Sequence, residues 1–135
     1  VLLIDLDPQG HLNNAKYLTY FEQARVSYLT ELGLFSKGQP FSELGVIIAD
    51  IHIQFEAPVL WGDPLKVGVR TAKIGRKSLT IEQCLLDADG DKLYAVGTVV
   101  LVAYDYSRHE TMLVPENWRH SISEFEAAAG QPPSS

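Results

Sequence analysis

The chain has 135 residues, of which 46% are hydrophobic and 21% are charged, and these fractions are ordinary for a globular domain. A chain of this length forms one domain that buries roughly two thirds of the surface exposed by its unfolded form. The net charge of −6 argues against nucleic acid as a partner, because nonspecific binding to phosphates needs a basic face.

The cysteine content and the lengths of the apolar runs indicate what kind of protein and which compartment to expect. With one cysteine, Cys84, the chain has neither an intrachain disulfide nor a cysteine-based zinc site, which suits the cytoplasm. No run approaches the roughly 18 apolar residues of a membrane span, so we expect no membrane partner. The opening VLLI is too short for the apolar region of a signal peptide, and we expect it to belong to a truncated first strand.

The first elements in chain order are a short strand, a turn and a long helix. Residues 1–5 predict the strand, and Pro8-Gln9-Gly10 predicts the turn. Asn14 is a candidate cap for the first turn of the helix, and Gly33 stands where a C-terminal cap belongs. Apolar residues recur between them at helical spacing: Tyr17, Leu18, Phe21, Ala24, Tyr28, Leu29 and Leu32.

Four strands are predicted after the helix. The segment VIIADIHIQFE alternates, which places Ile47, Ala49, Ile51, Ile53 and Phe55 on one face of the first of them. Three further strands at about 65–73, 78–87 and 92–105 are separated by turn-forming glycines and aspartates, and they predict an antiparallel meander. Both faces of the last strand are apolar, so we expect a second layer or a partner subunit to cover it.

The end of the chain predicts a short helix and a tail. Pro115 begins the helix, and Trp118, Ile122 and Phe125 mark its buried stripe. The chain is therefore predicted to be a single α+β domain at 1–128 with a flexible tail at 129–135. The edge and the uncovered face of its sheet predict self-association as a homodimer or a homotetramer.

The stretch DLDPQGHLNNAKYLTYFEQAR, residues 5–25, resembles the signature of hotdog-fold thioesterases. Its DP-x-G portion is similar to the 4-hydroxybenzoyl-CoA thioesterase family, and its DLD…HLNNAKY portion is similar to plant acyl-ACP thioesterases. FEAPVLWGDPL and the segment from GRKSLT to VAYD resemble the sheet of the same families. The resemblance covers roughly residues 1–120 and implies an antiparallel sheet wrapped around one long central helix, with hydrolysis of an acyl-CoA or acyl-ACP thioester.

The same resemblance implies a catalytic set of three residues. Asp7 takes the place of the carboxylate that attacks the thioester carbonyl or activates water; its plainer interpretation is a turn aspartate without chemistry. Asn14 stands at the helix start, where its backbone N–H is assigned to the oxyanion, and a role as an N-cap is compatible with this. His11 either positions water and polarises Asp7 or is a structural loop histidine.

Further residues are assigned to substrate binding. Gly10 forms the turn beside the thioester, Asn13 bonds either the Asp7 carboxylate or the turn backbone, and Tyr17 contributes to the pocket wall. Glu22, on the helix, is an alternative catalytic carboxylate, because another hotdog subgroup uses one there. Its plainer interpretation is an ion pair with Arg25, three residues later.

A CoA ligand would bring phosphates to this acidic protein. The compact basic cluster of the chain, Lys73, Arg76 and Lys77, lies at a predicted hairpin. Arg76 and Lys77 are assigned to these phosphates, with Ser78 as a further donor; the alternative is a solvated hairpin tip. We expect no cofactor and no metal, since thioester hydrolysis needs none. Two other functions stay open: a hotdog dehydratase or hydratase acting on acyl thioesters, and a non-catalytic acyl-binding module.

Overall fold

The computed structural model describes residues 14–34, 45–60, 63–90, 92–130 and 133. The strand predicted at residues 1–5 and the turn at 8–10 lie outside these ranges. The elements in chain order are α1 (Asn14–Glu31), β1 (Val46–Phe55), β2 (Leu65–Ile74), β3 (Ser78–Asp87), β4 (Leu93–Asp105), β5 (Glu110–Thr111) and α2 (Glu116–Ala128).

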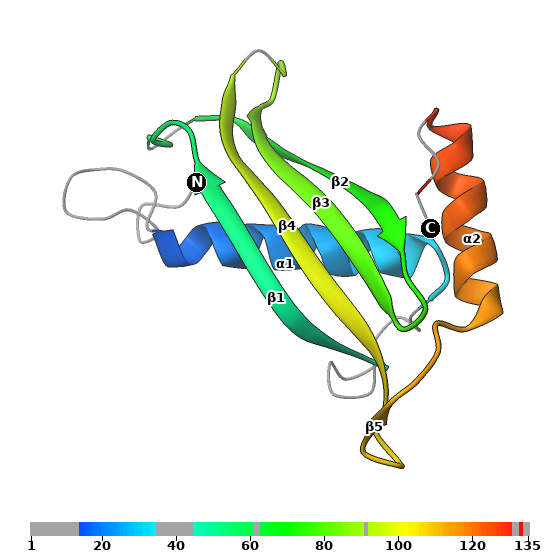
Figure 1. Ribbon diagram of the computed structural model, residues 1–135. Coiled ribbons are helices and arrows are strands. Elements are labelled where there is room, and N and C mark those ends of the chain that lie inside the picture. The colour runs from blue at the N-terminus through cyan, green and yellow to red at the C-terminus, as the bar shows by residue number, and fades with distance from the viewer. Residues whose placement is uncertain (1–13, 35–44, 61–62, 91, 131–132, 134–135) are drawn as a thin grey trace.

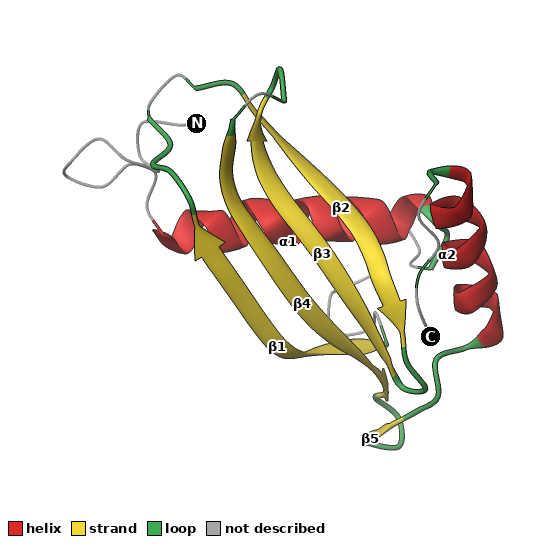
Figure 2. Ribbon diagram, turned by 45° about the horizontal axis from the view of Figure 1, so that its top comes forward, coloured by secondary structure: helices red, strands yellow, loops and turns green. Residues whose placement is uncertain are grey.

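The described strands form one antiparallel sheet, and α1 crosses a single face of it (Figure 1). The strand order is β1-β4-β3-β2, with the short β5 paired to β4. The turned view shows α1 running behind all four long strands, with α2 beside its far end (Figure 2). The predicted α+β class, an antiparallel sheet around one long helix with a short C-terminal helix, is confirmed.

Helix α1 ends as its sequence predicts. Gly33 has a φ of +78°, a conformation that glycine adopts at little cost. The Gly33 N–H donates to the carbonyl of Thr30, and the Leu34 N–H donates to the carbonyl of Leu29. This pair of hydrogen bonds is a Schellman motif, which satisfies carbonyls that the helix end would otherwise leave unpaired.

Strand β1 carries a bulge that changes the predicted face of its first residues. Its register with β4 shifts between Ile48 and Asp50. After the shift Ile51 pairs with Val99, on the face covered by α1, as the alternation predicts. Before it, Ile47 pairs with Val102 on the opposite face, so its predicted position alongside Ile51 is wrong. One extra residue in a strand reverses the alternation, and periodicity alone does not reveal it.

The core lies between α1 and the sheet in two clusters of buried side chains. The larger cluster brings the last turns of α1 and the buried stripe of α2 onto the sheet: Leu29, Val46, Ile74, Leu79, Ile81, Val99, Leu101, Ala103, Val114, Trp118 and Ile122. The smaller cluster packs side chains from the first turns of α1 against the sheet and the segment after β1: Tyr17, Phe21, Val59, Leu85, Tyr94 and Ala95.

Helix α2 buries a carboxylate where an aromatic ring is predicted. Trp118 and Ile122 are buried as expected, but Phe125 is 48% exposed and Glu126 is 2% exposed. The prediction for Phe125 is therefore wrong. Residues four apart share a helix face, which continues the stripe from Ile122 to Glu126. Glu126 is stabilised there because its Oε1 accepts hydrogen bonds from the Tyr28 hydroxyl and from the backbone N–H of Thr71.

In the described part of the chain, no helix is long and apolar enough to span a membrane.

Candidate active site

The N-terminus of α1 is the candidate catalytic end of the molecule. The helix begins at Asn14, the residue for which the sequence predicts a helix start. The first backbone N–H groups of a helix have no partner inside it and carry a partial positive charge. The first turn, NAKY, contains no acidic residue that would compete for these donors. This end of α1 can therefore stabilise an oxyanion or another negative group.

Two of the three predicted catalytic residues and two predicted substrate-binding residues precede the described part of the chain. Asp7, Gly10, His11 and Asn13 lie outside the described ranges, so their roles stay predictions. Their place in the chain is immediately before the start of α1.

Tyr17 is described, and it lies in the core under the first turns of α1. Its side chain is buried, and its ring meets the ring of Phe55 edge to face, with 4.8 Å between the ring centroids. Burial raises the pKa of the Tyr17 hydroxyl, while a hydrogen bond with the backbone of Val59 acts in the opposite direction. Tyr17 is not among the residues that line the cleft between α1 and β1, so its contribution to a pocket wall stays a prediction.

A cleft of about 170 Å³ lies between α1 and β1. The residues that line it are mostly apolar, and the side chains of two of these, Leu18 and Ile51, are exposed to solvent. Glu22 and Arg25 supply the charged part of the lining. The lining residues are Leu18, Phe21, Glu22, Arg25, Ile51, Ile53, Gly97 and Val99.

Arg25, one of the residues that line this cleft, is buried with an uncharged partner. It is 5% exposed, and its Nη1 donates to Oε1 of Gln83 on β3 over 2.9 Å. Nε2 of Gln83 donates in turn to the backbone carbonyl of Phe21 over 2.7 Å. Burial lowers the pKa of Arg25, and the charge of Glu22 partly opposes this shift. None of the described ion pairs involves Arg25. Glu22 therefore affects the pKa of Arg25 through its charge but does not form the predicted ion pair with it.

Sequence reasoning missed this buried polar pair. Charged and amide side chains are normally exposed, so the pattern assigned neither Arg25 nor Gln83 to the core. The signal was nevertheless present, because Arg25 follows Phe21 by four residues and precedes Leu29 by four. That spacing places all three on the face of α1 that meets the sheet.

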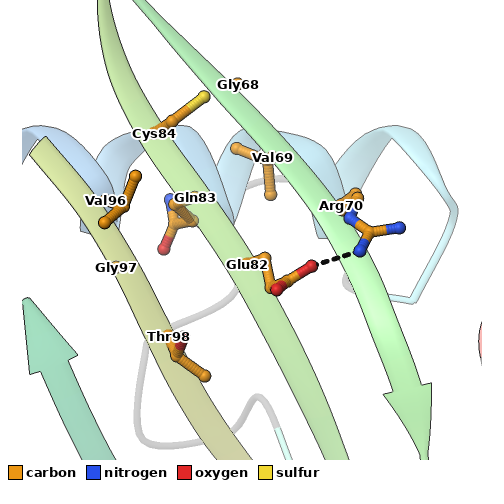
Figure 3. A pocket seen from close by; sticks show the side chains of 9 residues that line it. All are labelled: Gly68, Val69, Arg70, Glu82, Gln83, Cys84, Val96, Gly97 and Thr98. Atoms are coloured by element: carbon orange, nitrogen blue, oxygen red, sulfur yellow. Dashed lines mark hydrogen bonds and ion pairs between the residues drawn. The ribbon is translucent and has the colours of Figure 1, made fainter. Parts of the chain in front are cut away.

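A larger hollow of about 480 Å³ lies on the opposite face of the sheet (Figure 3). Its lining includes Gly68 and Cys84, which are paired across β2 and β3. The neighbouring pair, Arg70 and Glu82, forms an ion pair along its border. Because α1 lies behind the strands in this view, the hollow is separated by the sheet from the start of α1. It is therefore not part of the candidate catalytic end.

The basic hairpin between β2 and β3 is a compact, braced structure. Arg76 and Lys77 are exposed, and Ser78 begins β3. Arg119 of α2 donates to the carbonyls of Gly75 and Arg76. The hairpin thus gathers the predicted phosphate-binding residues and adds Arg119 as a neighbouring cation.

The hairpin lies at the end of the sheet that holds α2 and the last turns of α1 (Figure 1). Helix α1 has 18 residues, so its two ends are about 27 Å apart at 1.5 Å per residue. The structure therefore does not bring the hairpin of a protomer next to its own Asn14. Within the described ranges, no cluster of three or more histidine, cysteine, aspartate or glutamate side chains could hold a metal ion.

The comparison with protein families decides between the possible interpretations of this helix-on-sheet domain. A family model described as the thioesterase-like superfamily matches residues 1–122, which include the whole of the quoted motif, α1 and the sheet. The chain belongs to the thioesterase-like superfamily.

Solved structures and curated relatives agree with this membership. A Thermus thermophilus thioesterase solved with coenzyme A and zinc is 34% identical, with a TM-score of 0.81 over 98% of this chain and 92% of that one. YsmA of Bacillus subtilis, which is uncharacterized, is 28% identical over 73% of this chain. The match spans 64% of the length of YsmA. The long-chain acyl-CoA thioesterase FadM of Escherichia coli is 21% identical over 89% of this chain and 90% of its own. The hotdog fold implied by the motif is thus confirmed.

Proposed function

We propose that this protein hydrolyses an acyl-CoA or acyl-carrier-protein thioester to a carboxylic acid and a thiol. The observation that carries the proposal is the superfamily match over residues 1–122, with α1 beginning at Asn14, the last residue of the stretch DLDPQGHLNN at residues 5–14. The solved Thermus relative with bound coenzyme A and the name of FadM support CoA as the thiol part of the substrate.

The reaction requires a base or nucleophile and an oxyanion site. In the general-base form, Asp7 takes a proton from water as the water oxygen bonds to the thioester carbon. In the nucleophilic form, the Asp7 carboxylate bonds to that carbon and forms an anhydride, which water then hydrolyses. In both forms the carbon–sulfur bond breaks, and the leaving thiolate takes a proton from the Asp7 carboxyl in the general-base form or from water in the nucleophilic form. The sequence favours neither form.

The start of α1 supplies the oxyanion site in this proposal. The backbone N–H of Asn14 and its neighbours donate to the carbonyl oxygen as it becomes negative. Donors fixed by a folded helix need little reorganisation during the reaction, which is why such sites lower the barrier. His11 positions the attacking water, Asn13 bonds the Asp7 carboxylate, and Gly10 forms the turn that admits the thioester group.

Recognition of the nucleotide part is assigned to the basic hairpin. Arg76, Lys77 and the Ser78 hydroxyl bind CoA phosphates, and Arg119 braces the hairpin backbone from α2. The hairpin is distant from Asn14 of the same protomer, so we infer that an extended pantetheine arm or the hairpin of another protomer bridges the gap.

Self-association completes the proposal, with a homodimer as the smallest assembly. Strand β1 is an edge of the described sheet and carries exposed isoleucines, among them Ile47, Ile48 and Ile51. An exposed apolar edge is normally covered by a partner. A second copy of this chain against β1 would also border the cleft beside α1. A homotetramer would require a further contact.

Release of thiol from a panel of acyl-CoA substrates tests the function directly. The purified protein should produce free thiol from at least one member. An enoyl-CoA substrate separates hydrolysis from hydration, because hydration changes the ultraviolet absorbance of the enoyl group without releasing thiol. Absence of thiol with every acyl-CoA and acyl-carrier-protein substrate would exclude the proposed activity.

A further inference from the structure

The cleft between α1 and β1 follows the helix away from its candidate catalytic end. Leu18 is four residues after Asn14 and Arg25 is eleven residues after it, which correspond to about 6 Å and about 16 Å along the helix axis. A group held by its carbonyl at the start of α1 therefore meets the apolar walls first and Arg25 last.

Gly97 lies close to the ring of Phe21 in the lining of the cleft. A Cβ atom at position 97 would lie 3.3 Å from Cε2 of Phe21 and 3.6 Å from the carbonyl oxygen of His52. Glycine thus lets the Phe21 ring rest against β4. A methyl group at position 97 would require the Phe21 ring to move away from β4 by a few tenths of an ångström, and both residues line the cleft.

Arg25 is the α1 residue of the cleft lining that is farthest along the helix from Asn14. Its guanidinium is almost completely buried and already donates to Gln83, which is fixed by the Phe21 carbonyl. A hydrocarbon chain that reached Arg25 would remove the remaining water from this cation without offering an acceptor, which is unfavourable. Arg25 and Gln83 therefore disfavour longer acyl chains in two ways: they occupy space, and burying them against hydrocarbon costs free energy.

The volume of the cleft indicates the size of the group. About 170 Å³ is slightly more than the roughly 150 Å³ of an engineered protein cavity that holds one benzene molecule. The space fits about six carbon atoms, as a short chain or as one ring.

We propose that this cleft is the acyl subsite, that Gly97 sets its width through Phe21, and that Arg25 with Gln83 sets its length. The preferred substrates are then thioesters of short acyl groups with about six carbons beyond the carbonyl, or with a single ring. This inference rests on the proposed thioesterase function, and it adds the acyl class and the residues that select it.

The test is the chain-length profile of kcat/KM with butanoyl-, hexanoyl-, octanoyl- and dodecanoyl-CoA. The wild-type profile should peak near hexanoyl or octanoyl and fall at least about tenfold for dodecanoyl, since a pocket discriminates roughly tenfold or more for each misfitting methylene. Gly97→Ala should move the peak toward butanoyl. Leu18→Ala, at a site 44% exposed and so tolerant of change, should raise the rate for longer chains relative to butanoyl.

Gly68→Ala is the matched control. It is also a glycine-to-alanine change inside the sheet with a close neighbour, Sγ of Cys84 at 2.9 Å, but on the face away from α1. Its profile should equal that of the wild type. A wild-type peak at dodecanoyl overturns the inference, as does an unchanged profile in folded Gly97→Ala. If Gly97→Ala does not fold, the profile of Leu18→Ala decides.

A calorimetric experiment separates this inference from the proposed function. If no thioester is hydrolysed, the function fails, and the cleft is then judged by the binding of hexanoate and dodecanoate. Tighter binding of hexanoate that is weakened by Gly97→Ala supports the subsite. Absence of hexanoate binding, or equal binding in the two proteins, refutes it.

Discussion

Arg25 and Gln83, which are 58 residues apart in the chain, share a buried hydrogen bond of 2.9 Å that joins the middle of α1 to β3. The amide of Gln83 also donates to the Phe21 carbonyl, so both of its polar atoms bond to α1. An amide satisfied at both ends has one orientation, and it fixes how α1 lies along the sheet.

Replacing Gln83 should therefore destabilise the fold. We expect Gln83→Leu to lower the free energy of unfolding by about 2–3 kcal/mol, because it leaves a buried guanidinium without its acceptor. Urea denaturation measures the change. Gln83→Glu is the matched comparison, since it keeps an acceptor for Arg25 and should cost less than Gln83→Leu. Equal stability of Gln83→Leu and wild type would show that the pair does not support the helix.

Asp7→Asn should abolish hydrolysis while the protein stays folded. The amide has the shape of the carboxylate but can act neither as base nor as nucleophile, so turnover should fall at least about 100-fold. Thiol release measures turnover, and circular dichroism reports on folding. His11→Ala should lose less if the imidazole only orients groups. Retention of more than about a tenth of wild-type turnover by Asp7→Asn contradicts the assignment.

Regular elements followed from the sequence because local rules determine them. The alternation of residues 51–55, the turn residues of the meander and the glycine after α1 each predict a structure that the fold contains. The bulge at Ile48–Asp50 was not predictable, since it depends on pairing with β4. Burial of Glu126 in place of Phe125 was not predictable from the sequence either, because it depends on contacts with other elements. Its hydrogen-bond partners, Tyr28 and Thr71, are distant in sequence.

The candidate site was predictable to a different extent. The start of α1 was predictable from the motif to within one residue: Asn14 was expected to cap the helix and is its first residue. The cleft beside it could not, since its shape depends on Gly97 and Ile51 from two strands that meet only in the fold. The same holds for Arg119, which reaches the basic hairpin from α2.

The Tyr28 hydroxyl gives the fold a predicted sensitivity to alkaline pH. Burial and the hydrogen bond to Glu126 raise the pKa of Tyr28 above its ordinary value of 10.0. The folded protein thus holds this proton more tightly than the unfolded chain. The resulting stability is complete below pH 10.0 and is lost as the pH rises through the higher, folded-state pKa.

Denaturant titrations at about pH 8 and about pH 11 test this prediction. The free energy of unfolding should fall between the two, and the fall should be smaller in Tyr28→Phe. A fall of the same size in both proteins would assign the alkaline effect to other groups. Burial also raises the pKa of Tyr17, so part of the effect should persist in the variant.

The exposed isoleucines of the edge strand β1 predict association through that strand. Sedimentation at micromolar concentration should give a mass of at least twice 15.0 kDa. Ile48, which is 42% exposed, is the site for disruption, since a lysine there places a charge in an apolar interface. Ile48→Lys should shift the population toward monomer. Leu113→Lys, at a 57% exposed position before α2, is the control and should sediment as the wild type does. A monomeric wild type would contradict the dimer.

The basic hairpin makes the last prediction, which concerns substrate affinity. If Arg76 and Lys77 bind CoA phosphates, their replacement by alanine should raise KM for acyl-CoA and leave kcat nearly unchanged. Such contacts are made equally in the ground state and in the transition state. Lys66→Ala, which removes an exposed charge at the other end of β2, is the matched control and should leave KM unchanged.

Salt should reproduce the effect of the hairpin variant. The screening length falls from about 10 Å at 0.1 M to about 3 Å at 1 M, so exposed phosphate contacts weaken as salt rises. The wild-type KM should therefore increase with salt, and the KM of the Arg76→Ala, Lys77→Ala double variant should change little. A truncated thioester without the nucleotide should respond to neither treatment, because it has no phosphate to bind. If the double variant instead loses kcat on the truncated thioester, the hairpin shapes the catalytic end from a distance, and its assignment to the phosphates is wrong.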